Sequence, residues 1–236
     1  MKHIHFDSIS STNSYLKENY QKFDNFTFVS ADYQLCGKGR YERNWISEKG
    51  KNLLFSLLIK DEQLLNSFNV LSLVSAVSIC QYLEQTLKIK NVSIKWPNDV
   101  FVNNKKICGI LLEGQIPHYV VIGIGLNVNQ RNFVGEFNNS PTSISIELGH
   151  DIDIYQLKND LFKMILEKVS KLLDKKVEFF NYFANHNYLI NKDVSFEKDG
   201  ITIAGKVIEI DKDFQIQIKT EHGVEKLSSG EIFLEK

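Results

Sequence analysis

Glycines and cations alternate in a stretch of the sequence that follows no helical or strand period. Residues 34–51 hold, in close succession, Gly37, Lys38, Gly39, Arg40 and Arg43. Glycine lets the backbone approach a ligand closely, and neighbouring cations suit an anionic group such as phosphate. The spacing matches neither the P-loop nor the dinucleotide fingerprint, so a solvated turn is an equal alternative. Because long loops inside compact domains usually carry function, 34–51 is a candidate anion-binding loop.

A second candidate region is the segment 95–114, KWPNDVFVNNKKICGILLEG. Trp96-Pro97 favours an extended backbone, and Asn98-Asp99 can close a turn through side-chain hydrogen bonds. Such a turn alone is more typical of structure than of function. The two lysines that follow, Lys105 and Lys106, fit the exposed tip of a hairpin equally well.

Three glycines interrupt apolar strands. Gly109 lies in the run 107–114, and Gly123 and Gly125 recur with a period of two in the run 119–129. A strand glycine weakens a sheet unless something must lie against the backbone there. We therefore predict a slot for a flat, largely apolar ligand over these glycines, with a close helix crossing as the alternative.

His3 and His5 lie two residues apart and would share one face of a strand. The pair has no evident third ligand in the sequence, so we do not expect a metal site there. No G-x-S-x-G motif or local Cys/His pairing indicates nucleophilic catalysis.

The composition is that of a globular protein. Of the 236 residues, 43% are hydrophobic and 24% charged, and 28 lysines and arginines nearly balance 29 aspartates and glutamates. This balance argues against nucleic acid or an anionic membrane as a partner. The first residues carry no signal-peptide pattern, and the longest mostly apolar stretch, 69–80, is too short for a membrane span. Cys36, Cys80 and Cys108 lack metal-type spacing, which predicts reduced thiols and a cytoplasmic location.

The hydrophobic patterns predict an α+β fold with a mixed, largely antiparallel sheet backed by helices. The expected strands are 2–6, 26–33, 52–59, 92–95, 100–102, 107–114 and 119–129, and the expected helices are 10–20, 69–87, 154–174 and about 176–187. After Asn191 the sequence changes to short alternating strands joined by polar turns, which indicates a small β-barrel. We therefore predict a ligand-binding domain over 1–190 and a small C-terminal domain over 191–236.

Taken in order, several segments together resemble the biotin–protein ligases, also called biotin–acetyl-CoA-carboxylase ligases. The matching pieces are SSTNSY, ADYQLCGKGRYERNW, KWPNDV, KKICGILLEG, VVIGIGLNVN and SSGEI, and they span nearly the whole chain. The resemblance implies a catalytic domain like that of class II aminoacyl-tRNA synthetases, followed by a barrel like the Src-homology-3 fold. Many relatives carry an N-terminal helix-turn-helix domain and repress transcription. Here the chain begins on the expected catalytic strand, so we expect a monofunctional ligase.

The implied reaction has two steps. Biotin and ATP give biotinyl-5′-AMP and pyrophosphate, with Mg²⁺ as the expected metal, and biotin then passes to one lysine of a biotin carboxyl carrier protein or domain. A homodimer through an exposed sheet edge is compatible with the predicted fold.

The resemblance also implies roles for individual residues. The implied biotin-binding residues are Ser11, Thr12, Asn13, Gln34, Lys38, Gly39, Arg40, Lys106, Gly109, Leu111 and Gly123. The implied ATP-binding residues are Arg40, Arg43, Trp45, Lys95, Asn98 and Asn127. Lys106 and Arg40 are the expected catalytic cations, because adenylyl transfer brings a carboxylate toward a polyanion. Asp99 is a candidate for the Mg²⁺ shell or for deprotonating the carrier lysine.

One departure concerns the candidate loop. The family usually has Gly-Arg-Gly-Arg where this chain has Gly37-Lys38-Gly39-Arg40. Lysine keeps the charge but lacks the planar fork that binds phosphate at two points. We expect activity to be retained, and we expect any effect of the lysine to fall on how firmly the adenylate is held.

Three alternatives remain open at this stage. A lipoate–protein ligase shares the catalytic fold, but its usual Arg-Arg-x-Ser-Gly-Gly-Gly stretch is missing here. A non-catalytic protein that holds biotin or a nucleotide would not need the full set of loop cations. An oligonucleotide-binding module on the C-terminal barrel is disfavoured by the near-neutral charge and the few aromatic residues there.

Overall fold

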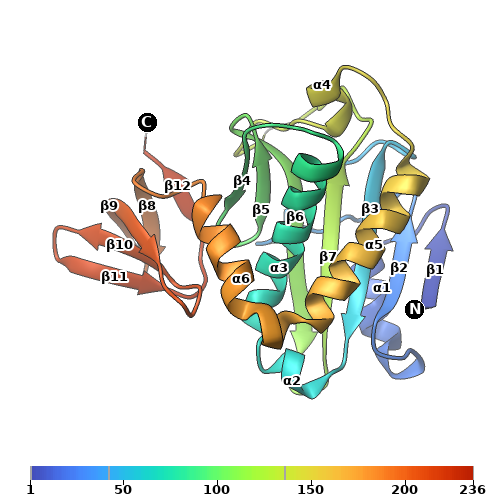
Figure 1. The fold of residues 1–236 in the computed structure, drawn as a ribbon, viewed down its shortest axis with the longest axis horizontal. Helices are drawn as coiled ribbons and strands as arrows, with labels where there is room; N and C mark the ends of the chain where they lie inside the picture. The colour runs from blue at the N-terminus through green and yellow to red at the C-terminus, as the bar shows by residue number, and fades with distance from the viewer. Residues whose placement is uncertain (1, 42, 136, 236) are drawn as a thin grey trace.

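The computed structural model describes residues 2–41, 43–135 and 137–235 and has an α+β fold built on a large mixed sheet (Figure 1). Its strands are β1 (Lys2–Phe6), β2 (Thr27–Ala31), β3 (Asn52–Ile59), β4 (Val92–Lys95), β5 (Asp99–Val102), β6 (Lys105–Gln115) and β7 (Tyr119–Asn127). They are arranged in the order β1-β2-β3-β7-β6-β5-β4. β1 pairs with β2 in parallel, and every other neighbouring pair is antiparallel. The predicted fold class is confirmed.

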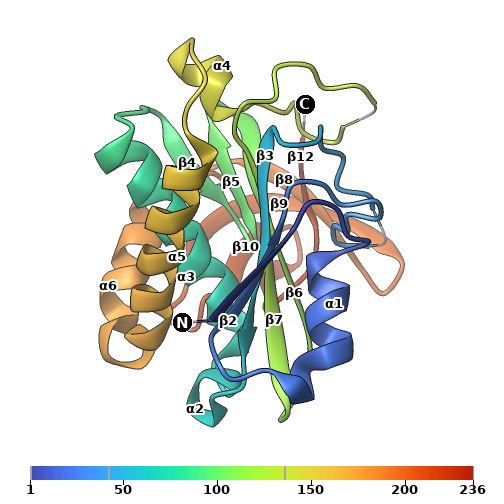
Figure 2. The same ribbon diagram turned by 90° about the vertical axis from the view of Figure 1, so that its right-hand side faces the viewer.

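Helices cover the two faces of this sheet unequally. The helices α3 (Phe68–Gln81), α5 (Ile154–Ser170) and α6 (Leu172–Asn185) cover one face, whereas α1 (Thr12–Asn19) lies on the other (Figure 2). α5, α6 and the sheet enclose α3. This helix accordingly has apolar residues on all sides and not on one face only. α5 and α6 are amphipathic and bury one face each. α1 leaves part of its face of the sheet uncovered.

The C-terminal strands form a second, smaller sheet beside the β4 edge of the first (Figure 1). They are β8 (Asp193–Lys198), β9 (Ile201–Ile210), β10 (Ile216–Thr220), β11 (Gly223–Leu227) and β12 (Ile232–Leu234), in the antiparallel order β11-β10-β9-β8-β12. Alternate residues such as Val194, Phe196, Ile216 and Ile218 point inward and are buried. The Trp96 Nε1 donates a hydrogen bond of 3.0 Å to the carbonyl of Phe214, so the two sheets are directly joined.

Several boundaries differ from those predicted. The expected helix 154–174 ends at Ser170, because Lys171 leaves the helical conformation before α6 begins. α3 is followed by a π-helical turn, Tyr82–Thr86. Two short helices, α2 (Glu62–Leu65) and α4 (Ile144–Leu148), were not predicted, and in each the first turn is capped by the preceding Asp61 or Ser143 side chain. In the described part of the chain, none of the helices combines the length and the hydrophobicity needed to cross a bilayer.

Candidate active site

A cavity of about 580 Å³ opens on the α1 face of the large sheet. Its walls come from the start of α1, the loop between β2 and β3, the β4–β5 turn, β6, β7, Phe133 and the segment 137–141, together with Glu231 and Ile232 at the start of β12. The predicted site residues that line it are Ser11, Thr12, Asn13, Gln34, Lys38, Gly39, Arg40, Arg43, Trp45, Lys95, Asn98, Asp99, Lys106, Gly109, Gly123 and Asn127. Leu111 does not line the cavity and instead pairs with Gly123 across the β6–β7 ladder.

One end of the cavity, here called the inner end, is built from uncharged hydrogen-bonding groups at the start of α1. Ser11 caps the helix. The backbone N–H and the Oγ1 of Thr12 donate to Gln34 Oε1 at 2.7 and 2.9 Å. Ser56 Oγ lies 2.7 Å from Thr12 Oγ1 and 2.5 Å from Asn13 Oδ1. These buried groups are held in one arrangement, because each is hydrogen-bonded to another.

Asn13 is also fixed from behind by a charged pair. Its Nδ2 donates to Glu113 Oε2 at 2.8 Å, and Lys17 pairs with the same carboxylate. Partial burial raises the pKa of the Glu113 carboxyl, but the hydrogen bonds from Lys17 and Asn13 outweigh burial and hold that pKa below its usual range. The carboxylate therefore stays charged and accepts both donors at neutral pH.

Gly123 makes room for this asparagine. A Cβ at position 123 would lie 2.2 Å from Asn13 Oδ1. No side-chain atom fits at that distance, so the glycine is required for the close approach of α1 to β7. The occupant above Gly123 is therefore a side chain of the protein itself.

The opposite, outer end of the cavity is cationic. Four basic side chains that line the cavity, Arg40, Arg43, Lys95 and Lys106, lie at this end with two described carboxylates, Asp99 and Glu231, whereas the charge of a fifth, Lys38, acts on Glu113 behind the inner end. An excess of positive charge in a partly enclosed space suits a polyanion such as a nucleotide phosphate chain.

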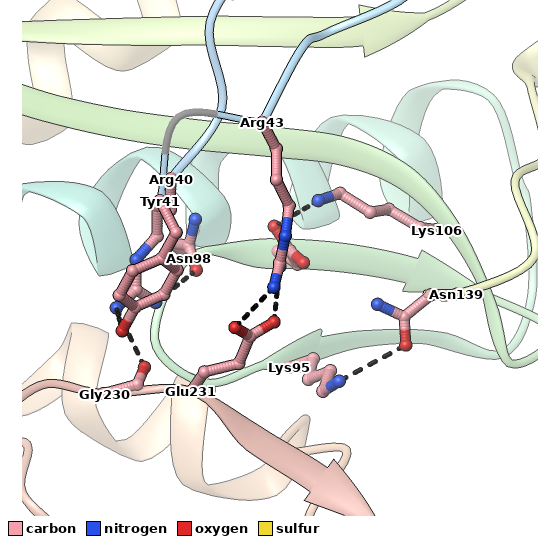
Figure 3. A network of polar contacts seen from close by, with 10 residues as sticks. Arg40, Tyr41, Arg43, Lys95, Asn98, Lys106, Asn139, Gly230 and Glu231 are labelled. Atoms are coloured by element: carbon pink, nitrogen blue, oxygen red, sulfur yellow. Dashed lines mark hydrogen bonds and ion pairs between the residues drawn. The ribbon is translucent and has the colours of Figure 1, made fainter. Parts of the chain in front are cut away.

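These cations are held by defined partners (Figure 3). Arg43 binds Glu231 through two hydrogen bonds of 2.5 and 2.7 Å. Arg40 donates to the carbonyl of Gly230 at 2.8 Å and to Asn98 Oδ1 at 3.2 Å. The C-terminal sheet thus contacts the loop that follows β2 through both arginines.

The two lysines of the outer end also have specific neighbours. Lys106 Nζ lies 2.8 Å from Asp99 Oδ1, and Lys95 Nζ donates to Asn139 Oδ1 at 3.3 Å. Burial lowers the pKa of Lys95, and the nearby positive charges of Lys106 and Arg43 lower it further. The Asp99 carboxylate acts in the opposite direction. Partial burial raises the pKa of Glu231, but the hydrogen bonds and charge of Arg43 outweigh it, so that pKa falls below its usual range.

A β-bulge directs Lys106 into the cavity. Asp99 and Val100 pair with Gly109 and Cys108, but the next residue, Phe101, pairs with Lys106, so Ile107 is an extra residue in β6. Strict alternation would place Lys105 on the same face as Gly109. The extra residue shifts the alternation by one and brings Lys106 to that face instead, where a Cβ at position 109 would lie 3.3 Å from its Nζ.

Trp45 covers the other two strand glycines. A Cβ at position 125 would lie 2.5 Å from its Cε2, and one at position 109 would lie 2.9 Å from its Cζ3. The space that we expected to hold a flat ligand is therefore occupied by an indole from the loop. Trp45 Nε1 and Asn127 Oδ1 are buried and have no hydrogen-bond partner among the described residues. Both atoms line a cavity wall, where buried groups of this kind point to a missing ligand or water.

The sequence did not indicate several residues of this site. Glu113 and Ser56 show no sequence signal, because each meets Asn13 only through tertiary packing. Glu231 stands in the SSGEI segment, which entered the resemblance without an assigned role. The segment 133–141, which provides Asn139 and Phe137, follows no helical or strand period.

Comparison with known proteins gives a consistent result. The family model described as "Biotin/lipoate A/B protein ligase family" matches residues 5–127. The bifunctional ligase/repressor BirA of Bacillus subtilis (strain 168) is 32% identical over 218 residues, which cover 88% of this chain and 66% of that protein. The biotin--[acetyl-CoA-carboxylase] ligase of Paracoccus denitrificans is 32% identical over 134 residues, which cover 53% of this chain and 55% of that protein.

A solved structure matches over the full length. Biotin protein ligase from Aquifex aeolicus, in complex with biotin and ATP, has a TM-score of 0.88 and 31% sequence identity, and the match covers 100% of this chain and 99% of that chain. The sheet with its two unequal helical faces, the added C-terminal sheet and the cation-lined cavity thus define a ligase-type fold. The chain belongs to the biotin/lipoate A/B protein ligase family. It spans about two thirds (66%) of the length of the Bacillus relatives that it matches.

Proposed function

We propose that this protein is an ATP-dependent biotin–protein ligase, which forms biotinyl-5′-AMP and then biotinylates a lysine of a biotin carboxyl carrier domain. The observation that carries the proposal is a single cavity with an uncharged, hydrogen-bonding inner end and a cationic outer end. The B. subtilis and P. denitrificans relatives are named as ligases, and the A. aeolicus structure holds biotin and ATP, which supports the same activity here.

The inner end suits the ureido ring of biotin. That ring is uncharged, with two N–H donors and one carbonyl acceptor, and the groups around Thr12, Asn13 and Gln34 include both donors and acceptors. Because these groups are already fixed by one another, little ordering entropy remains to be lost on binding.

The outer end suits the reacting phosphates. In the first step a biotin carboxylate oxygen attacks the α-phosphorus of ATP, the bond to the β-phosphate breaks, and pyrophosphate leaves. The carboxylate is already ionised at neutral pH, so this step needs no general base. Lys106 and Arg40 would offset the repulsion between the two anions, with Lys95 and Arg43 in support.

The second step requires a neutral amine on the carrier lysine. That amine attacks the biotinyl carbonyl, AMP leaves, and one proton is released. Asp99 is the proposed acceptor of this proton, because its carboxylate lines the cavity beside Lys106. Mg²⁺ would reach the site mainly on the phosphates of ATP, with Asp99 as the candidate protein ligand.

The division into a catalytic domain over 1–190 and a C-terminal domain over 191–236 is part of this proposal. The second sheet begins at β8, and its Gly230 and Glu231 contact the arginines of the outer end. The use of ATP and a carrier domain fits a cytoplasmic protein. β1 is an edge strand among the described residues, and most of its residues are exposed, which suits pairing with a second copy in a homodimer.

Biotin-dependent exchange of pyrophosphate into ATP tests this proposal. Purified protein with ATP and Mg²⁺ should exchange pyrophosphate when biotin is added and not when lipoate is added. Equal exchange with lipoate would favour lipoate–protein ligase activity. Tight biotin binding without exchange would favour a non-catalytic binding protein.

A further inference from the structure

A second polar cluster lies at the β1 edge of the large sheet, outside the cavity described above. It consists of His5 at the end of β1, Asp7 just beyond it, and Asp32 just beyond β2. One potential ligand atom from each of these three residues lies within 4.8 Å of the other two. We propose that His5, Asp7 and Asp32 form a binding site for a divalent transition-metal ion such as Zn²⁺.

The parallel pairing of β1 with β2 brings these residues together. His5 is the register partner of Ser30, and side chains two residues apart in a strand share a face. By the same alternation, Asp7 shares a face with His5, and Asp32 shares that face with Ser30. The ladder continues past the strand ends, because the backbone N–H of Asp32 donates to the Phe6 carbonyl at 3.0 Å. The backbone of Asp32 is thus fixed next to the residue that precedes Asp7.

The distances suit a metal of this class. His5 Nε2 lies 3.3 Å from Asp32 Oδ1. Two ligands of a tetrahedral ion, each at about 2.0–2.1 Å from the metal, are separated by about 3.4 Å. The imidazole and the carboxylate would therefore need only small adjustments to share one ion.

The imidazole is already oriented for this role. His5 Nδ1 lies 2.9 Å from Ser30 Oγ, which leaves Nε2 to face the carboxylates. Metal-ligating histidines usually bind such an outer partner through the second ring nitrogen. His3 Nε2 contacts the same hydroxyl at 2.8 Å and so reinforces the position of Ser30.

The donor set favours zinc-like ions over Mg²⁺. One imidazole and two carboxylates match the ligands of Zn²⁺, whereas Mg²⁺ prefers oxygen ligands throughout. The His5 and Asp32 side chains are 37% and 47% exposed, so an ion could enter from solvent and keep water in a remaining position. Lys158 lines the neighbouring cavity, but its ammonium lies over the Tyr155 ring, 4.9 Å from the centroid.

The proposal differs from the sequence expectation in its choice of ligands. His3 and His5 do not act together as ligands. The missing partners of His5 are Asp7, two residues along the strand, and Asp32, which only the β1–β2 pairing reveals.

A metal at this position would fix the beginning of the loop that follows β2. The Asp32 carbonyl accepts a hydrogen bond of 2.9 Å from the N–H of Gly50, so Asp32 closes the base of the loop that carries Lys38, Arg40 and Arg43. The ion would tie this base to the edge strand β1. The site does not depend on the proposed ligase activity and can be tested without it.

Calorimetric titration of metal-stripped protein with Zn²⁺, in excess Mg²⁺, tests the proposal. The background variant is Cys36→Ser, which removes the exposed thiol as a competing zinc ligand. We expect one equivalent of Zn²⁺ to bind and to raise the melting temperature. Asp7→Asn, an isosteric change at an exposed position, should weaken binding at least about tenfold, as should His5→Ala.

His222→Ala is the matched control, because His222 is an exposed histidine beside an acidic residue, Glu221, in the turn between β10 and β11. It should leave zinc binding unchanged. Binding that survives both Asp7→Asn and His5→Ala, or an absence of stoichiometric binding in the background protein, would overturn the proposal. If His5→Ala fails to fold, Asp7→Asn decides the matter alone.

Discussion

The inner and outer ends of the cavity hold polar groups in different ways. At the inner end, uncharged side chains from α1 and β3 satisfy one another, and a charged pair behind them fixes Asn13. At the outer end, two of the cations, Lys106 and Arg43, are held by ion pairs with Asp99 and Glu231. The inner end is therefore preorganised by its internal hydrogen bonds, whereas the outer end keeps its charges positioned through contacts that a phosphate can compete with.

The strand glycines show the same difference. Gly123 lies under Asn13, which is part of a buried network on a regular helix. Gly125 lies under Trp45, which belongs to a loop. Both glycines give the same signal in the sequence, yet a side chain at 123 would collide with a residue of α1 and one at 125 would collide with the Trp45 side chain of the loop that follows β2.

The largest effect is expected for Lys106→Ala. Removal of a cation that stabilises developing charge costs about 3 kcal/mol, or roughly a hundredfold in rate. The rate of adenylate formation in pyrophosphate exchange should fall by this factor. Lys105→Ala is the matched control, because Lys105 precedes the bulge and is exposed, and it should have little effect. Equal effects of the two changes would show that the bulge does not select Lys106.

The second prediction compares Gly123→Ala with Gly125→Ala. The methyl group at 123 would force Asn13 out of its network, so the free energy of unfolding should fall by about 1–3 kcal/mol and biotin binding should be lost. The methyl group at 125 would displace only Trp45, so stability should change by less than about 1 kcal/mol. Chemical denaturation and biotin calorimetry measure both quantities. Equal destabilisation by the two changes would contradict the proposed difference between the ends.

The third prediction concerns Glu231→Gln, which removes the charge that orients Arg43. The pair is partly exposed, so its loss should cost no more than about 1 kcal/mol. We expect the KM for ATP to rise by about fivefold, with kcat and the affinity for biotin nearly unchanged. Glu225→Gln, which breaks the exposed Lys198–Glu225 pair in the same sheet, is the control and should leave all three quantities unchanged. A fall in the affinity for biotin would mean that the two ends are not independent.

Much of the scaffold could be predicted because its signals are local. The strands 52–59 and 92–95 were placed with the bounds that the structure has, since an apolar run and an alternating run stand between clear breakers. The two helices after residue 154 were expected, although their junction was placed four residues late. That junction depends on the conformation of Lys171, for which the sequence carries no glycine or proline signal.

The arrangement of the site was harder to predict because its contacts are distant in sequence. Arg43 and Glu231 are 188 residues apart, and Asn13 and Glu113 are 100 apart. The family resemblance implies that Lys106 contacts the ligand. The period of two in β6 would instead place Lys105 on the cavity face. Only the strand register, with its extra residue Ile107, shows that Lys106 is on that face. The strand glycines indicated that some group lies close against the backbone. The sequence could not show whether that group is a ligand or a side chain of the protein, here Asn13 or Trp45.

The smallest effect is expected from the titration of Lys95 at the outer end. Because burial and the charges of Lys106 and Arg43 lower the pKa of Lys95, its ammonium should deprotonate at a pH below that of an ordinary lysine. Between its folded and unfolded pKa values the unfolded chain binds more protons, so the contribution of Lys95 to the free energy of unfolding rises with pH in that window. The rate of adenylate formation should change in the opposite direction and fall by a fewfold, because one supporting cation is lost while biotin and ATP stay ionised. Lys95→Arg keeps its charge at these pH values and should remove the alkaline fall, whereas Lys105→Arg should not. Pyrophosphate exchange between neutral pH and pH 10 measures the effect, and identical alkaline profiles for wild type and Lys95→Arg would show that Lys95 does not support the reaction.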